Sequence, residues 1–392
     1  MTQIHRYSFP TDIFFGAGAI SLAPELLQKN GFSRPLILTD TMMAEFELIK
    51  SLKARLNNVG LTTNVSAPVF GNPDSTQVKQ GVADFHSHNA DSIIAIGGGA
   101  ALDVAKAVAL MAYHDGTIFD YEDGKSTREI KYQIPFVIAI PTTAGTGSEV
   151  GRSTVISDPV THEKKIIFDP RLLAKIVLAD PELTLQLPAH LTAATGMDAL
   201  THLVESFLAK GSHPMCEGIA LEGLRLTARS LKKCFDYAQE GAPHSAEHLG
   251  VRTDMMHAAM MGAVAFQKGL GVNHSCAHAL STVTNMHHGL ANAIMLPFCM
   301  RFNFNGCEEQ FGRLAQAVGL QNEIDFIQWL IKLRSDIHIP ANLSDARFNS
   351  DKIRDLVEVA FKDGCHASNP KPVSKSDLQG IFTSAFSAES LC

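Results

Sequence analysis

The sequence predicts an α/β domain with a mostly parallel sheet, followed by an all-helical domain. In the first half, short apolar runs alternate with helical stretches at 43–58 and 75–89. The apolar runs are "PLILTD" (35–40), "SIIAIGGG" (92–99) and "PFVIAIPTTAGTGSE" (135–149). Such runs of aliphatic and β-branched residues are typical of strands buried on both faces, with helices covering the sheet. After about residue 184 only long helical patterns follow, so we place the domains at 1–184 and 185–392.

Length and composition limit the class of protein. A chain of 392 residues is expected to form two domains rather than one core. The net charge of −7 and the pI of about 6.2 argue against a nucleic-acid partner. The most apolar window, 92–111, is interrupted by three glycines, Asp103 and Lys106, so no membrane span is expected. The seven cysteines are scattered without a CxxC pair, which favours reduced thiols and a cytoplasmic protein.

Two loops follow predicted strands and suit a bound diphosphate. "IGGGAALDVAK" (96–106) is a strand, three glycines and a helix start, where backbone N–H groups and the helix dipole can hold phosphate. It is not the G-x-G-x-x-G fingerprint, and a simple tight turn is the alternative. "PTTAGTGSE" (141–149) offers hydroxyl groups for phosphate or ribose oxygens, or is a solvated loop. Asp40, which also ends a strand, suits a ribose 2′-hydroxyl or serves only as a cap.

A second pattern predicts metal ligands. In "TGMDALTHLVE" (195–205), Asp198 and His202 lie four residues apart on one helix face, so both can point at one atom. The alternative for such a pair is a surface hydrogen bond.

"GVNHSCAHALSTVTNMHHG" (271–289) holds four of the 17 histidines: His274, His278, His287 and His288. In one straight helix, the 14 residues from His274 to His288 would span about 21 Å. Two imidazoles on one metal need nitrogens within about 4 Å of each other. A shared metal therefore requires a break in the helix, which the poor helix formers at 282–284 and then Asn285 favour. Otherwise these are core or surface histidines.

Together these motifs resemble the iron-containing, or group III, alcohol dehydrogenases. The motifs are "AIGGG", "IPTTAGTGSE", "LTAATGMDALTH", "KGLGVNHSCAHAL", "HHGLANAIMLP" and "DGCHASNPKPVSKSDL", and they extend over nearly the whole chain. The resemblance implies a dehydroquinate-synthase-like fold. Its N-terminal α/β domain binds a dinucleotide, its C-terminal all-helical domain binds a metal, and its active site lies in the cleft between them.

The resemblance also implies roles for single residues. The metal ligands would be Asp198, His202, His274 and His288. His278 would lie by the nicotinamide and the substrate as a catalytic residue, and Asp40 would favour NAD over NADP. The other expected cofactor contacts are Gly97, Gly98, Gly99, Asp103, Thr142, Thr143, Thr146, Ser148 and Lys164.

The chain departs from the family pattern at three positions. Ala100 stands where the family usually has serine, which removes one phosphate-facing hydroxyl. Ala279 and His287 each stand where it usually has proline. The last change leaves His287 and His288 as rival ligands, and we favour His288 because it directly precedes Gly289, as the family ligand does.

The predicted function is a metal-dependent, NAD-linked oxidoreductase that interconverts a small primary alcohol or diol and its aldehyde by hydride transfer. Fe²⁺ is the expected metal and Zn²⁺ the alternative. A homodimer is expected. One competing hypothesis is a sugar-phosphate cyclase or lyase of the dehydroquinate synthase type, which should need a Lys and Arg cluster that the motifs within 185–300 lack. Another is a non-catalytic nucleotide- or metal-binding protein.

Overall fold

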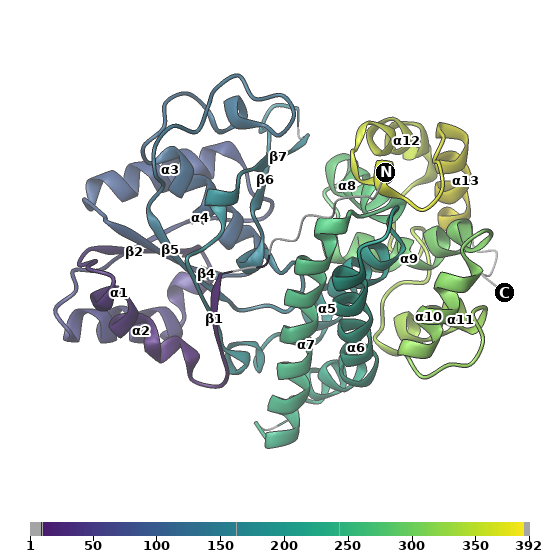
Figure 1. Cartoon of the computed structure of the whole chain (residues 1–392), viewed down its shortest axis with the longest axis horizontal. Coiled ribbons are helices and arrows are strands. Elements are labelled where there is room, and N and C mark those ends of the chain that lie inside the picture. The colour runs from purple at the N-terminus through teal and green to yellow at the C-terminus, as the bar shows by residue number, and fades with distance from the viewer. Residues whose placement is uncertain (1–8, 10, 162, 243, 388–392) are drawn as a thin grey trace. The chain divides into compact units, whose positions relative to one another are not determined.

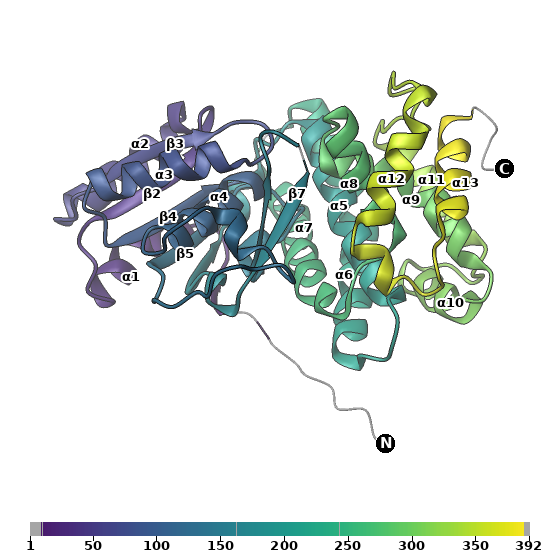
Figure 2. The same ribbon diagram turned by 90° about the horizontal axis from the view of Figure 1, so that it is seen from above.

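The computed structural model describes residues 9, 11–161, 163–242 and 244–387. Within these ranges the chain forms two compact units. The sheet unit comprises residues up to 143 together with 147–184, and the helical unit comprises 144–146 together with the residues from 185 onward. The predicted kinds of architecture, a parallel sheet with helices and then helices alone, are confirmed (Figures 1 and 2). The assignment of 1–184 and 185–392 as domains stays a prediction.

The sheet unit is built on a parallel sheet whose strand order is β1-β8-β5-β4-β2-β3. Its strands are β1 (Asp12–Phe15), β2 (Pro35–Asp40), β3 (Asn64–Val69), β4 (Ser92–Gly97), β5 (Phe136–Pro141) and β8 (Ile176–Ala179). A separate antiparallel pair consists of β6 (Ser153–Ser157) and β7 (Lys164–Phe168).

Helices cover both faces of the parallel sheet. They are α1 (Ala23–Lys29), α2 (Glu47–Asn58), α3 (Ser75–Ser87) and α4 (Gly99–Met111). Side chains of β2 alternate between the faces: Ile37 packs in a core with α1 and α2, whereas Leu38 faces Gly81 of α3. All residues of β4 are buried, as the continuous apolar run predicts.

The strand order brings three predicted motifs to one edge of the sheet. β5, β4 and β2 are neighbours, and the final residues of β4 and β5, Gly97 and Pro141, are register partners. Because all three strands are parallel, the loops after them and Asp40 at the end of β2 lie along the same edge. Ligands of such sheets bind at this carboxyl edge.

The helical unit contains nine α-helices among the described residues. They are α5 (Ala189–Leu208), α6 (Pro214–Glu240), α7 (Ala246–Ala265), α8 (Val272–Thr284), α9 (His288–Phe304), α10 (Glu308–Ala317), α11 (Asp325–Asp336), α12 (Ile353–Lys362) and α13 (Lys375–Phe386). α5 packs against α6, α7 and α9, and α8 packs against α9 and α12 (Figure 1). In the part of the chain that the structure describes, no helix has the length and apolar character needed to span a bilayer.

A buried polar cluster fixes α4 to the loop before β6. The ammonium of Lys106, 4% exposed, donates to the backbone carbonyl and hydroxyl of Ser148 and lies 3.1 Å from a carboxylate oxygen of Asp103. Next to Ser148, Glu149 is also buried. Burial raises the pKa of Glu149 to about 7, although its backbone amide and the charge of Lys106 oppose this shift.

Glu149 should make the stability of the sheet unit depend on pH. Its pKa is higher in the folded chain than the ordinary value of 4.5, so the unfolded chain loses this proton first. The free energy of unfolding should therefore fall by up to about 3 kcal/mol as the pH rises from 4.5 to 7, and then stay level. Glu149→Gln should abolish this dependence of the free energy of unfolding on pH. The measurement is a urea titration at each pH, in which hydrogen exchange of peptides from α4 and β5 monitors unfolding of the sheet unit. Glu25→Gln at the exposed start of α1 controls for the change in net charge; equal slopes in all three proteins would contradict the prediction.

Candidate active site

The histidine-rich segment folds as two helices with a break between them, as predicted. α8 ends at Thr284, Asn285 adopts the left-handed conformation with a φ of 55°, and α9 begins at His288. Asparagine tolerates this conformation better than most residues, which explains the termination here. The break lets His274 and His288 come together, and their ring centroids lie 5.5 Å apart.

Three of the four predicted ligands form a compact donor group. One ligand atom each from Asp198, His274 and His288 lies within 4.8 Å of the others. The Nε2 atom of His288 is 3.4 Å from an oxygen of Asp198. Asp198 and His274 are almost fully buried, and the His288 side chain is 24% exposed. One carboxylate oxygen and two imidazole nitrogens in such a group could bind a divalent transition metal.

The fourth predicted ligand, His202, lies beside this group. Its ring stacks on that of His274 with centroids 4.7 Å apart, but it is not one of the three side chains whose donor atoms converge within 4.8 Å. Burial lowers the pKa of His202 to about 4, although the charge of Asp198 opposes the shift. The ring is therefore neutral at pH 7. A hydrogen bond to the backbone of Gly145 also opposes this shift of the pKa.

The two adjacent histidines at the start of α9 have different surroundings. His287 is exposed and is the N-cap of α9, where its Nδ1 atom accepts a hydrogen bond of 3.4 Å from the backbone N–H of Leu290. His288 instead belongs to the donor group with Asp198 and His274. This geometry favours His288 as the ligand. Gly289 follows, and a Cβ atom there would lie 2.4 Å from the carbonyl oxygen of Ala194 on α5, so only glycine allows this close approach.

Glu205 is a site residue that the sequence analysis did not identify. It lies on α5, is 2% exposed, and accepts hydrogen bonds from the backbone N–H groups of Asn273 (2.7 Å) and His274 (3.2 Å) at the start of α8. It also binds Nδ1 of His274 at 2.6 Å. Burial opposes protonation of His274, but the hydrogen bond and charge of Glu205 outweigh it and raise the pKa of this imidazole. With the Nδ1 proton directed to a carboxylate, Nε2 is left as the ligand atom.

Asn292 is a second residue that the sequence analysis missed. Its side-chain carbonyl accepts a hydrogen bond from the amide of Asn273, which orients the Nδ2 group toward the donor atoms. That group donates to Asp198 at 2.7 Å and lies 3.4 Å from Nε2 of His274 and 3.2 Å from Nε2 of His288. The spacing along the helices could have identified both residues. Asn292 follows His288 by four residues and Glu205 follows Asp198 by seven, and either spacing places the two residues on one helix face.

The predicted catalytic residue His278 lies next to the donor group without belonging to it. Its ring stacks on that of His288 with centroids 5.2 Å apart, and it is 5.9 Å from the ring of His274. Its Nδ1 atom bonds to Asp363, a residue that sequence spacing gave no reason to connect with it.

In the sheet unit, the glycine turn and Asp40 lie close together. Gly97 has a φ of 146°, a conformation that other residues rarely adopt. A Cβ atom there would also lie 2.7 Å from the Cβ of Ala101 and 3.6 Å from Oδ2 of Asp40. The other oxygen of Asp40 accepts hydrogen bonds from the N–H groups of Met42 and Met43. Asp40 thus caps the turn with one oxygen, while its second oxygen lies on the side of the glycine loop.

The two predicted phosphate loops are neighbours. Gly98 is the N-cap of α4, so no N-cap side chain accepts from the first N–H groups of this helix. It lies beside the side chain of Thr143. Gly99 is the first residue of α4, so the uncapped N–H groups of this helix begin at the loop. Thr142 is buried and its N–H group binds the carbonyl of Gly97. This is the arrangement in which a helix start can hold a phosphate.

The remaining predicted cofactor residues form hydrogen bonds within the protein or belong to other segments than the glycine turn. Ser148 donates to Asp103 within the buried Lys106 cluster, and a carboxylate oxygen of Asp103 also accepts from the N–H of Val155. Lys164 begins β7 opposite Ser157. Thr146 is half-buried in the short segment that groups with the helical unit.

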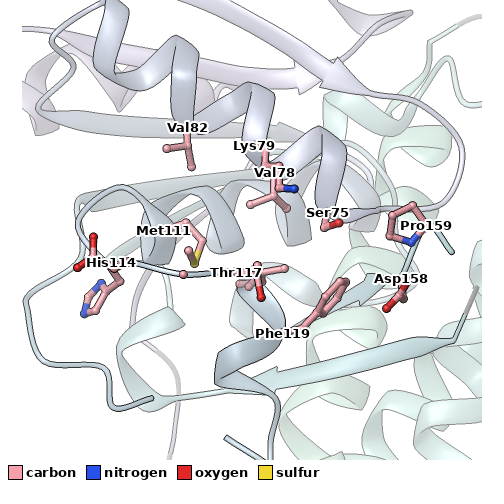
Figure 3. A pocket seen from close by; sticks show the side chains of 13 residues that line it. Ser75, Val78, Lys79, Val82, Met111, His114, Thr117, Phe119, Asp158 and Pro159 are labelled. Atoms are coloured by element: carbon pink, nitrogen blue, oxygen red, sulfur yellow. The ribbon is translucent and has the colours of Figure 1, made fainter. Parts of the chain in front are cut away.

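The sheet unit also has an open cavity of about 510 Å³ beside α3 (Figure 3). Val78, Lys79 and Val82 line it on the α3 side, opposite Thr117 and Phe119. None of the predicted cofactor residues lines this cavity.

Comparisons with known proteins identify the family. Residues 10–181 match the model of the family described as "Iron-containing alcohol dehydrogenase", and residues 192–386 match "Fe-containing alcohol dehydrogenase family, C-terminal". A 4-hydroxybutyrate dehydrogenase of Cupriavidus necator is 35% identical over 384 residues, which are 95% of this chain and 97% of that protein. The chain therefore belongs to the iron-containing alcohol dehydrogenase family.

Solved structures agree with this assignment. A 1,3-propanediol oxidoreductase superposes with a TM-score of 0.91 at 32% identity, with 98% of this chain and all of that chain covered. A sulfoacetaldehyde reductase from Bifidobacterium kashiwanohense, solved in complex with NAD⁺, has a TM-score of 0.89 at 25% identity, with 99% of this chain and all of that one covered. The predicted fold class and the predicted NAD-linked oxidoreductase acting on an alcohol or diol are confirmed. The cyclase and the non-catalytic alternatives are not supported.

Glu205 should be essential for the stability of the helical unit. Glu205→Ala would leave two buried backbone N–H groups and one imidazole N–H without their acceptor, at a cost of about 3 kcal/mol. For a unit of this size, the unfolding midpoint should fall by roughly 5–10 °C. Differential scanning calorimetry after treatment with EDTA separates this effect from metal binding. Glu358→Ala, which removes a carboxylate from the exposed pair with Lys375, should leave the midpoint unchanged; a wild-type midpoint for Glu205→Ala would contradict the prediction.

Proposed function

We propose that Asp198, His202, His274 and His288 hold a divalent metal in the helical unit. The donor group of Asp198, His274 and His288 supports this, and so does the place of buried His202, whose ring stacks on that of His274. The carboxylate of Glu205 on Nδ1 of His274 is the partner that a metal-binding imidazole typically has. One carboxylate with three imidazoles suits either Fe²⁺ or Zn²⁺. We propose iron, in accord with the family.

We further propose that the sheet unit binds NAD along its carboxyl edge. The start of α4 and the loop at 141–143 would hold the diphosphate through backbone N–H groups and hydroxyls. Asp40 would accept a hydrogen bond from a ribose 2′-hydroxyl through the oxygen that faces Gly97. The same negative charge would repel the 2′-phosphate of NADP. Asp103 and Ser148, which belong to the buried Lys106 cluster, would support the loop at 141–143.

The proposed reaction converts a short primary alcohol or diol and NAD into the aldehyde and NADH, and the reverse. The metal would polarise the substrate oxygen as a Lewis acid, and NAD would accept the hydride. Within the protein, Asn292 holds Asp198 in place, Glu205 orients His274, and His278 beside them can accept the hydroxyl proton at Nε2. 4-hydroxybutyrate and 1,3-propanediol, named for two similar proteins, are short chains with a terminal hydroxyl, which supports this substrate class.

The observation that carries this proposal is the convergence of Asp198, His274 and His288 in a chain of this family. It is tested by assaying a panel of short alcohols, diols and aldehydes with NAD or NADH, with and without added Fe²⁺ or Zn²⁺. Metal-dependent reduction of NAD by at least one primary alcohol is the expected result. A homodimer and a cytoplasmic location are further proposals from the sequence.

His288, and not His287, should retain the metal. His288→Ala removes one donor of the group, so the metal affinity should fall at least about 100-fold and activity should fall with it. His287→Ala removes only an exposed N-cap, at a cost of about 1 kcal/mol, and should keep its metal. Both variants are purified in parallel and their metal content is measured by mass spectrometry. A metal-free His287→Ala protein would show that the ligand assignment is wrong by one residue.

Asp40 should set the preference for NAD. Asp40→Asn keeps a side-chain acceptor for the N–H groups of Met42 and Met43 but removes the charge. The ratio of kcat/KM for NAD over NADP should fall by about tenfold or more, as expected for loss of one charged hydrogen bond. Steady-state kinetics with both cofactors measure this ratio, and Asp91→Asn at the far end of the sheet serves as a control for charge. A wild-type enzyme that already prefers NADP would disprove this role.

A further inference from the structure

His278 is held from one side by a carboxylate that belongs to a distant part of the chain. Its Nδ1 atom lies 2.8 Å from Oδ2 of Asp363, the C-cap residue that directly follows α12. The two residues are 85 positions apart, and both side chains are largely buried, at 14% and 16% exposure. A hydrogen bond of this kind, largely shielded from water, holds an imidazole in one orientation more firmly than a surface contact does.

The carboxylate of Asp363 is itself fixed by other donors. Its Oδ1 atom accepts hydrogen bonds from the Ser275 hydroxyl at 2.7 Å and from the N–H of Cys365 at 2.9 Å. The Ser275 hydroxyl in turn accepts from the N–H of His366 at 2.9 Å. These bonds tie the residues after α12 to α8, which carries both Ser275 and His278. Asp363 is therefore anchored to the helix whose histidine it binds.

The same donors keep Asp363 ionised. Burial alone would raise the pKa of Asp363, but the charge and hydrogen bond of His278 together with the bonds from Ser275 and Cys365 lower it well below its ordinary value. An ionised carboxylate can only accept hydrogen bonds. The proton of a neutral His278 ring must then be on Nδ1, and the lone pair on Nε2.

The geometry points to Asp363 as a positioning residue for the reaction, which holds His278 in the Nδ1–H tautomer with Nε2 available to the substrate hydroxyl. The inference rests on the proposed function, in which His278 acts at the substrate oxygen. The ring of His278 stacks on His288 of the proposed metal site, so its orientation also determines where Nε2 lies relative to a substrate bound there. A carboxylate that orients an imidazole in this way contributes to catalysis without touching the reacting atoms.

The alternative is that His278, Asp363 and Cys365 form a second metal site, because one ligand atom from each lies within 4.8 Å of the others. Two observations favour the hydrogen-bonded pair. Both oxygens of Asp363 already accept hydrogen bonds. Burial, with the charge of Asp363, raises the pKa of the Cys365 thiol well above its ordinary value, and only the thiolate is a good ligand.

A double-mutant cycle tests the inference. Asp363→Asn, His278→Ala and the double variant are compared with the wild type as holoenzymes, with NAD and 1,3-propanediol or the best alcohol found. Asp363→Asn should lower kcat about 10–100-fold with little change in the KM for NAD. In the His278→Ala background the same change should have an effect of less than about twofold, because Asp363 acts through His278. Asp377→Asn in the capping box of α13 is the matched control and should keep wild-type kcat.

Two further measurements distinguish the alternatives. Metal content should stay at one ion per chain in Asp363→Asn, whereas a wild type with two ions and a variant with one would establish the second metal site and overturn the inference. Nitrogen NMR of ¹⁵N-histidine in the Zn²⁺-loaded wild type, with the signal assigned by its loss in His278→Ala, should show the proton on Nδ1. This experiment needs no folded Asp363 variant, and a proton on Nε2 would overturn the inference.

The kinetic results also separate this inference from the proposed function. If the wild type turns over no alcohol with NAD, the proposed function fails. If the wild type is active and Asp363→Asn lowers kcat by the same factor with and without His278, Asp363 acts independently of His278 and only the positioning role is refuted.

Discussion

The buried carboxylate of Glu205 is the interaction on which the geometry of the helical unit depends. α5 carries Asp198 and His202 on the same face as Glu205, and Glu205 binds both the start of α8 and the ring of His274. One side chain therefore fixes the distance between the helix that supplies two proposed ligands and the helix that supplies the third. A buried charge is tolerated here because three donors surround it, two of which are N–H groups that a helix start would otherwise leave unsatisfied.

Two histidines of α8, four residues apart, are each paired with a carboxylate from another part of the chain, and we propose different roles for them. Glu205 binds Nδ1 of His274 and Asp363 binds Nδ1 of His278, so each ring is oriented with Nε2 directed away from its carboxylate. His274 is almost fully buried and belongs to the donor group with Asp198 and His288, which suits a ligand. His278 is more exposed and lies outside that group, which suits proton transfer with a substrate. In the proposed function, the same kind of carboxylate–imidazole hydrogen bond would orient one ring for metal binding and the other for proton transfer.

Sequence patterns predicted the parts of this protein whose geometry is local. The strands β2, β4 and β5 follow from continuous apolar runs, and the end of α8 at Thr284 follows from poor helix formers before Asn285. Apolar runs did not predict β1 and β3, because both are edge strands with several exposed or polar residues. Glu205 and Asn292 share helix faces with predicted ligands and were within reach of spacing arguments. Spacing along the chain could not connect Asp363 with His278, because only the packing of α12 against α8 brings the two residues together.

The three departures from the family pattern have different physical consequences. At the start of α9, where the family usually has proline, His287 has a φ of −56°, which lies within the range that a proline ring imposes. The backbone path into the helix is therefore the one that proline would give, and the imidazole adds a side-chain cap to the N–H of Leu290 that proline could not supply. Ala279 is fully buried inside α8 and keeps that helix regular between His278 and its end. Ala100 lies in the first turn of α4 and lacks the hydroxyl of the usual serine, so the proposed phosphate recognition there would depend more heavily on the backbone N–H groups of the helix start.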